Sequence, residues 1–191
     1  CLFSPGLPIP RPAVEAAGRA AGVSAPAAAL DRLIGLGLVD DWGQAGQITL
    51  VAANPLARPL AANLDEALGA RLADAALPEL DRYWREPDGT FPWDPRALET
   101  ARLALAATAP SPGTLDAASA AAARFLFNQN DDARQALDAL LKPALTRLET
   151  LASPASTRLL LVTADCAERL AEAELLDRVL DQSKQVEGDP F

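Results

Sequence analysis

The sequence predicts a mostly α-helical protein with one small β-hairpin near its N-terminus, followed by an antiparallel array of helices. Ala and Leu, which favour helices, occur 42 and 32 times, whereas the β-branched Val and Ile occur only 7 and 3 times. Half of the 191 residues are hydrophobic, which is enough for a packed core. Prolines and glycines divide the chain into helix-length segments, and only one segment has the pattern of a hairpin.

Two short helices are expected near the N-terminus. Segment 1–12 contains four prolines and predicts irregular structure, because proline has no amide hydrogen to donate. A helix over 12–22 follows, with a proline in its first turn and a glycine at its end. A second helix over 24–35 starts with Ser24 as its N-cap. Its apolar stripe consists of Leu30, Leu33 and Ile34.

A hairpin is expected directly after these helices. Its strands cover 38–42 and 47–51, and the loop 43–46 between them contains two glycines. The order helix, helix, strand, wing, strand is typical of a winged helix-turn-helix module, which we expect over 1–54. Such a module usually has one more helix in front, so we expect its first helix to be truncated and the chain to be a piece of a longer protein.

The remainder, 55–191, is expected to form the helical array. Leucines recur every fourth residue from Leu56 to Leu72, which predicts one long helix that Pro78 kinks or ends. A loop over 85–93 follows, and Asp94 caps the next helix, which runs to about Ala107.

Four more helices complete this array. One starts at Thr114 or Asp116 and ends near Phe127, and the others cover 131–151, 156–170 and 172–186. The last two together have the length of one tetratricopeptide repeat, although irregular helical hairpins explain the same residues equally well.

Charge limits the classes of partner. The net charge is −9, and all of it lies in 65–191, because 1–64 holds four arginines and four acidic residues. An acidic field repels nucleic acid and anionic membranes, and we expect neither as a partner. No apolar run is long enough to span a membrane, and no signal peptide is recognisable, so we expect a cytoplasmic location.

The residue inventory limits the chemistry. Histidine is absent, which excludes the Ser-His-Asp triad, the Cys-His dyad and His-ligated metals. No phosphate-binding Gly-x-x-x-x-Gly-Lys-Ser/Thr run is present. Cys166 is expected to be a buried structural thiol. Asp165, Glu168 and Glu172 are expected to form a solvated acidic face. We therefore predict no catalytic residues, no metal site and no cofactor, and a chain that is not an enzyme.

Four aromatic residues form the best candidate for a partner-binding surface. They are Tyr83, Trp84, Phe91 and Trp93, and they cluster around a proline-containing loop. The alternative is that they cover the seam between the two domains. The three tryptophans, of which Trp42 is the first, are individually more typical of core anchors than of ligand sites.

The order of these parts resembles one family over residues 1–84. Leu2-Phe3-Ser4-Pro5-Gly6, Leu30-Asp31-Arg32-Leu33 and the post-wing run Asn54-Pro55-Leu56-Ala57-Arg58 are similar to segments of STAND-class signal-transduction ATPases with NB-ARC-like modules. The resemblance implies a winged helix between a nucleotide-binding core and a helical-repeat sensor. It also implies nucleotide sensing at Asn54, where the family typically has a histidine. Asn can donate a hydrogen bond there but carries no charge.

These observations predict a non-catalytic regulatory region of a STAND-like ATPase. It would pack against an ATPase or effector, and a protein partner, expected to be basic, would bind its helices. An upstream nucleotide-binding domain of the same parent chain would be a second partner. The alternative is a DNA-binding winged-helix transcription regulator, although the helix that would read bases is rich in alanine. A third hypothesis is an enzyme with a carboxylate-based site.

Overall fold

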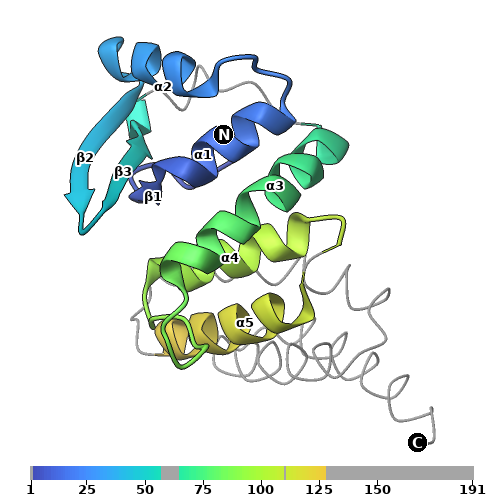
Figure 1. The fold of residues 1–191 in the computed structure, drawn as a ribbon. Coiled ribbons are helices and arrows are strands. Elements are labelled where there is room, and N and C mark those ends of the chain that lie inside the picture. Colours follow the sequence, from blue (N-terminus) through green and yellow to red (C-terminus); the bar gives the residue numbers. More distant parts are fainter. Residues whose placement is uncertain (1, 57–64, 110, 128–191) are drawn as a thin grey trace, which may run out of the picture. The chain divides into compact units, whose positions relative to one another are not determined.

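The structure is a computed structural model that describes residues 2–56, 65–109 and 111–127. The helices expected over 131–151, 156–170 and 172–186, together with Cys166 and the acidic face around it, lie outside the described residues. The described part is mostly helical and has a small antiparallel sheet, as predicted. Its elements are β1 (Ile9–Pro10), α1 (Arg11–Ala20), α2 (Pro26–Gly35), β2 (Val39–Ala45), β3 (Ile48–Ala53), α3 (Glu66–Trp84), α4 (Pro95–Ala106) and α5 (Pro112–Phe127) (Figure 1).

The described residues belong to two compact units. The first contains the residues up to Arg85 and 106–109, and the second contains 86–105 and 111–127. The first unit continues past the boundary that the sequence predicts at residue 54, because α3 packs against α1 and β1. The segment 106–109 joins it through Asp74, whose Oδ1 accepts hydrogen bonds from the backbone N–H groups of Thr108 and Ala109.

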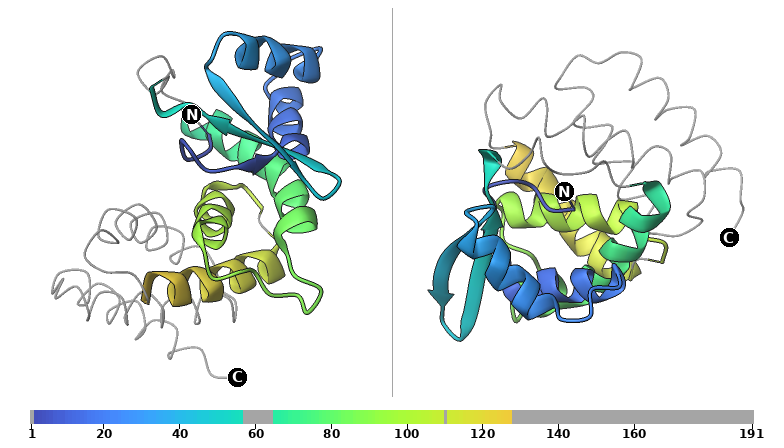
Figure 2. Two further views of the ribbon diagram at one scale, coloured as in Figure 1. Left: turned by 90° about the vertical axis from the view of Figure 1, so that its left-hand side faces the viewer. Right: turned by 90° about the horizontal axis from the view of Figure 1, so that it is seen from above.

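In the first unit, α1 lies between α2 and α3 (Figure 1, Figure 2). Three small residues of α1, Ala13, Ala16 and Ala17, are buried there. α1 also packs against β1 and β3, so it contacts both the sheet and the other two helices. Small side chains let neighbouring backbones approach closely, and this explains why an alanine-rich segment forms the centre of the unit.

The sheet has three strands in the order β1-β3-β2, and all neighbours are antiparallel. The proline-rich segment expected to be irregular contains β1, in which Ile9 pairs with Val51 and Pro10 with Leu50. The sequence prediction missed this strand. Proline is tolerated here because β1 is an edge strand. An edge strand has a neighbour on one side only, so the missing N–H group of a proline does not have to break the hydrogen-bond pattern of the sheet. Ile9 and Val51 are both buried.

The hairpin differs from its prediction in the position of its turn. The loop expected over 43–46 is wrong, since β2 continues to Ala45 and only Gly46 and Gln47 form the turn. The register between β2 and β3 shifts between Asp41 and Gln44. Gly43 lies in this bulge with φ +75°, a conformation that glycine adopts at no steric cost.

Prolines mark the starts of the first two helices. Each begins with a proline in its first turn, as predicted. The expected N-cap at Ser24 is wrong, because Ala25 occupies the N-cap of α2 and no side chain caps it. Of the expected stripe on α2, only Leu30 is buried; Leu33 is exposed and Ile34 is half-buried.

The prediction of one continuous helix from Leu56 to Leu72 is wrong at Asp65, which is extended, while residues 57–64 lie outside the described residues. α3 begins only at Glu66, because Asp65 caps it by accepting a hydrogen bond of 2.8 Å from the backbone N–H of Leu68. Pro78 does not end the helix, which continues to Trp84. Pro78 cannot donate to the carbonyl of Asp74, a loss that α3 tolerates on its exposed side.

The second unit contains the loop after α3, α4 up to Leu105, and α5. Asp94 caps α4 as predicted, and its Oδ1 accepts a hydrogen bond of 2.8 Å from the backbone N–H of Arg96. Within α4, the buried Glu99 accepts hydrogen bonds of 3.0 and 2.7 Å from Arg102. α5 begins at Pro112, slightly earlier than predicted. Among the described residues, no helix combines the length and hydrophobicity needed to cross a bilayer.

Candidate interaction surface

The four aromatic residues proposed as a partner-binding surface do not share one exposed patch. Trp84 and Phe91 are only 4% and 1% exposed, Tyr83 is half-buried and Trp93 is 57% exposed. Trp84 and Phe91 therefore pack inside the protein, and only Trp93 and part of Tyr83 remain accessible to a partner. Partner binding at those two residues stays a prediction.

An arginine side chain lies over the ring of each of the two accessible aromatic residues, Tyr83 and Trp93. The guanidinium carbon of Arg82 lies 5.3 Å from the ring centroid of Tyr83 in the first unit. The guanidinium carbon of Arg124 lies 4.8 Å from the ring centroid of Trp93 in the second. Such cation–π pairs at exposed sites contribute about 0.5–1 kcal/mol each. They also place a positive charge beside each ring.

The tryptophans also differ from the expectation that they anchor cores. Trp84 is a core residue, as predicted, but Trp42 in β2 is 57% exposed, like Trp93. The prediction is wrong for Trp42 because residue type alone favours burial, whereas β2 exposes every residue from Asp41 to Ala45. An exposed tryptophan on a hairpin is a stronger candidate for binding than a buried one.

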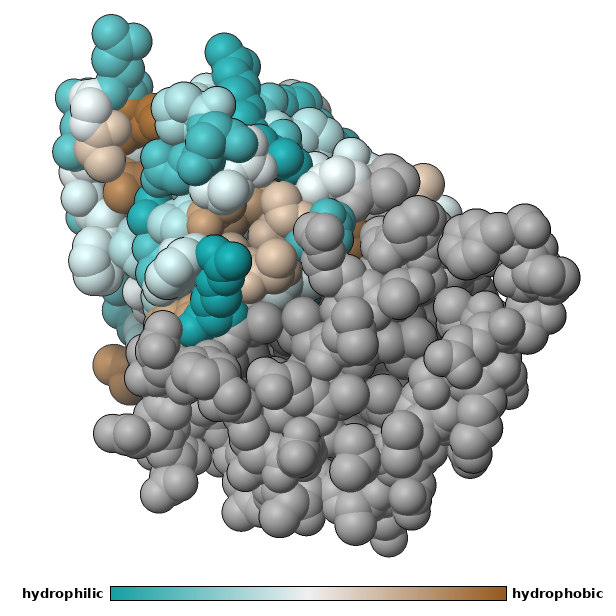
Figure 3. All heavy atoms as spheres, turned by 90° about the horizontal axis from the view of Figure 1, so that it is seen from below, coloured by the Kyte–Doolittle hydropathy of each residue, from teal (hydrophilic) through white to brown (hydrophobic). Residues whose placement is uncertain are grey.

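Trp42 is accompanied by other exposed hydrophobic residues in the same part of the chain. Leu33 in α2 and Leu36 directly after it are 39% and 70% exposed. We call Leu33, Leu36 and Trp42 the α2–β2 group; α2 packs against β2. Figure 3 shows one face of the molecule, on which brown hydrophobic residues are scattered among teal and white ones. The exposed hydrophobic residues of the α2–β2 group are candidates for contact with a partner.

α2 is held to α1 by one arginine. The Nε of Arg11 donates to Glu15 over 2.8 Å, and its Nη2 donates to Asp31 over 2.8 Å and to the carbonyl of Ala27 over 3.3 Å. The hydrogen bond to Glu15, and then the one to Asp31, raise the pKa of Arg11. Since Asp31 and Ala27 belong to α2, this side chain and the buried Leu30 attach that helix.

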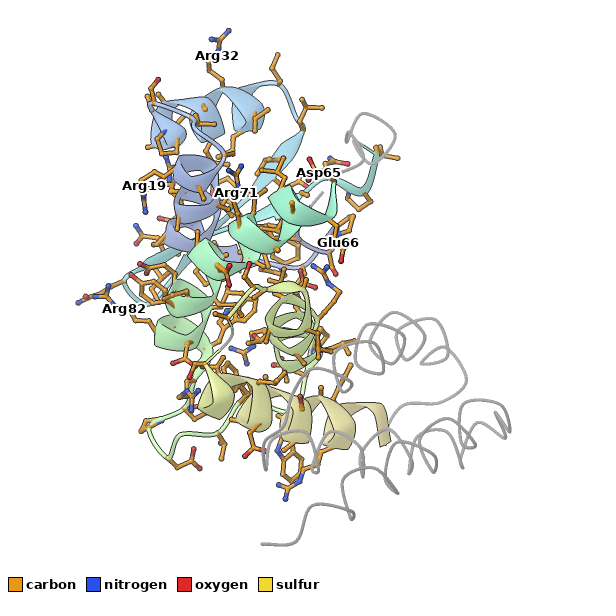
Figure 4. The ribbon with its side chains drawn as sticks, turned by 90° about the vertical axis from the view of Figure 1, so that its right-hand side faces the viewer. Arg19, Arg32, Asp65, Glu66, Arg71 and Arg82 are labelled. Carbon is orange, nitrogen blue, oxygen red and sulfur yellow. The ribbon has the colours of Figure 1, made fainter. Side chains whose placement is uncertain are left out.

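Some charged side chains of the first unit point into solvent, and others lie at a helix start. Figure 4 shows Arg32 and Arg82 extending away from the fold, while Asp65 and Glu66 lie at the start of α3. Acidic side chains at a helix N-terminus interact favourably with the helix dipole and stabilise the helix. The positions of Asp65 and Glu66 therefore have a structural explanation. Arg19 and Arg32 make no ion pair within the described part of the chain.

Asn54, the position that the family resemblance assigns to nucleotide sensing, is engaged locally. Its side-chain oxygen accepts a hydrogen bond of 2.9 Å from the backbone N–H of Leu56, and its amide donates to Asp40 over 3.3 Å. The neighbouring Asp40 carboxylate repels an anionic phosphate. The surroundings of Asn54 therefore favour a turn-stabilising role, and sensing there stays a prediction.

Within 2–56, 65–109 and 111–127, no three His, Cys, Asp or Glu residues are grouped so that they could hold a metal ion. Comparisons with protein-family models, with curated proteins and with solved structures find no match. The resemblance to STAND-class ATPases thus depends on the sequence motifs given above. In the described part of the chain, the strongest candidate for a site is the α2–β2 group, which was not expected from the sequence. Its only sequence signal was a tryptophan in a short strand.

Proposed function

We propose that the chain is a non-catalytic, regulatory protein-interaction region of a STAND-like signalling ATPase. It packs against an ATPase or effector and binds a protein partner through its helices. The order α1, α2, β2, turn, β3 supports a winged-helix-like module, and β1 adds a third strand to its sheet. The following helices α3, α4 and α5 support a helical array, and its tetratricopeptide-like character is part of the proposal.

One observation carries the protein-binding part of this proposal. α2 buries only Leu30, and the α2–β2 group exposes two leucines and a tryptophan. Exposed apolar residues of these types bind proteins by excluding water, whereas binding to DNA depends on Arg and Lys contacts to phosphates. A surface of this composition suits a protein partner.

DNA binding is the second candidate, and a specific observation favours it. Arg19 in α1 and Arg32 in α2 are exposed and have no acidic partner among the described residues. Two arginines on neighbouring helices could contact phosphates. The hairpin weakens this candidate, since its strands and turn carry Asp40 and Asp41 and no basic residue. We expect no shift of a duplex at protein concentrations up to about 1 μM at physiological salt.

Two measurements test the proposed function. The first is the intact mass of the protein captured from its source cells, read together with the coding sequence upstream of Cys1. We expect a mass well above the 20.0 kDa of this chain and an upstream phosphate-binding loop. A mass near that of this chain, with no such loop in the same reading frame, would overturn the ATPase part of the proposal.

The second measurement is ATP hydrolysis by the parent protein. If α2 helps to hold the ATPase inactive, Leu36→Asp should raise the basal rate several-fold, because a charge prevents apolar packing at that position. Ala28→Asp is the matched control: it adds the same charge at an exposed position of α2 that does not belong to the α2–β2 group. Equal rates for the parent protein and both variants would count against packing through this surface.

A further inference from the structure

We propose that the free edge of β2 accepts a short, extended and basic segment of a partner protein as an added strand. The inference rests on the proposed protein-interaction function, and it names both the surface and the chemistry of the partner. Strand addition of this kind obtains affinity from backbone hydrogen bonds and specificity from side chains along the strand.

The first observation is the position of β2 in the sheet. In the strand order β1-β3-β2, β2 pairs with β3 alone among the described residues, and Figure 1 shows it on the outer side of the hairpin. Its residues from Asp41 to Ala45 are all exposed. An edge strand presents backbone N–H and C=O groups that another extended segment can pair with.

The second observation is charge, and it selects the occupant. The sequence between Arg32 and Arg58 contains two charged residues, Asp40 and Asp41, and both lie in β2. Pairing of β2 with a second copy of itself would bring these carboxylates close together, and like charges across a strand pair are destabilising. A partner with Lys or Arg would meet them favourably, so charge complementarity favours a basic segment over self-association.

The third observation is the exposed tryptophan beside these carboxylates. Trp42 follows Asp41 directly and is 57% exposed. Tryptophan is among the residues that contribute most to binding when a partner covers them. Successive side chains of a strand alternate between its two faces. A segment that alternates basic and apolar residues could therefore contact the Asp41 carboxylate with one face and the Trp42 ring with the other.

The bulge limits the length of the added strand. The Oδ1 of Asp41 accepts a hydrogen bond of 2.8 Å from the backbone N–H of Gly43, and this bond supports the bulge. Bulges interrupt regular pairing and protect edges against uncontrolled addition. The regular part of the edge before the bulge therefore covers Val39 to Asp41, of which Val39 and Asp40 are half-buried and Asp41 is exposed. We expect a short added strand and a Kd of about 10–100 μM.

The test uses the full chain and a synthetic hexapeptide of alternating Lys and Val, followed by amide NMR. We expect the largest shifts at the amides of Val39 to Trp42. The same peptide with N-methyl groups on alternate residues keeps its charge but loses half of its backbone donors. It should bind at least about 10-fold more weakly. Equal binding of both peptides, no binding, or shifts confined to other elements would overturn strand addition.

Two variants link binding to the named residues. Asp41→Asn keeps a side-chain oxygen for the hydrogen bond from Gly43 but removes the charge, and it should weaken binding about 3–10-fold. Trp42→Ala should weaken it at least as much, whereas Val23→Ala, at an exposed apolar position between α1 and α2, should leave it unchanged. Equal effects of the two alanine variants would contradict the site. If the parent ATPase is found and the peptide does not bind, this inference fails while the proposed function stands.

Discussion

The two helices α1 and α2 have the same length and the same proline start, but they differ in how they are used. Each has 10 residues. α1 buries three alanines and packs against α2, α3, β1 and β3. α2 buries only Leu30. Two helices that look alike in the sequence therefore have different surroundings, one central and one largely exposed.

This difference separates stability from binding within the first unit. Residues of α1 are constrained by neighbours on several sides, so substitutions there should act on folding. Most residues of α2 face solvent, so they are available to a partner and substitutions there should change folding little. Leu30 and the Arg11 hydrogen bonds are the exceptions, because they attach α2.

The largest expected effect is at the attachment of α2. Leu30→Ala should lower the free energy of unfolding by about 2–5 kcal/mol, since it removes the buried side chain of this helix. Leu36→Ala, at a position that is 70% exposed, should change it by less than about 0.5 kcal/mol. Urea denaturation followed by circular dichroism measures both. Similar midpoints for the two variants would mean that α2 is not attached through Leu30.

The next effect compares the two helices directly. Ala13→Leu adds volume at a fully buried position of α1 and should cost about 1–3 kcal/mol. Ala28→Leu makes the same change on the exposed side of α2 and should be nearly neutral. Thermal unfolding of the pair checks this. Equal losses would contradict the assignment of α1 as the central helix.

A smaller effect concerns the closest approach of the two helices. A Cβ atom added at Gly18 in α1 would lie 3.0 Å from the Cβ of Pro26 in α2, whereas one added at Gly69 in α3 would meet nothing within 4 Å. Gly69→Ala should therefore stabilise the protein by about 0.5–1 kcal/mol through helix propensity. Gly18→Ala should lose that gain or become destabilising. Equal stabilisation by both, in the same denaturation assay, would show that α2 yields easily at this contact.

The smallest effect concerns Arg11. The Asp31 side chain is 62% exposed, so solvent screens its pair with Arg11, and Arg11→Met should cost about 0.5–1 kcal/mol. The pKa of Arg11 is raised, so its contribution is complete at every pH below its ordinary pKa and is lost only as the pH rises through the raised value. The cost of Arg11→Met should thus be the same at about pH 7 and about pH 9. A cost that falls between these two values would contradict the assigned charge.

Local signals in the sequence predicted the helix starts well. Pro12, Pro26 and Asp94 lie where the structure begins α1, α2 and α4, because the conformation of proline and the oxygen of a capping aspartate act on their own turn. The position of the hairpin was predicted for the same reason. Its turn was misplaced because Gly43 belongs to a bulge and not to the loop.

Features that depend on distant residues were missed. β1 forms only because β3 lies beside it, and nothing in a proline-rich segment indicates such a partner. The leucine repeat from Leu56 suggested a continuous helix, but the cap at Asp65 starts α3 later. The exposure of Trp42 was missed for a related reason: residue type favours burial, whereas β2 lies at an edge that the sequence does not reveal.

The junction between β1 and α1 has a consequence for the order in which the protein folds. β1 ends at Pro10 and α1 begins at Arg11, so no connecting residue separates them. The β2–β3 hairpin closes a two-residue turn and can form within microseconds. The pairing of Ile9 with Val51 joins positions about forty residues apart in the sequence. It closes a long loop that contains α1 and α2, so it should form more slowly than the hairpin. We therefore expect β1 to dock late, and its arrival brings α1 into place in the same step.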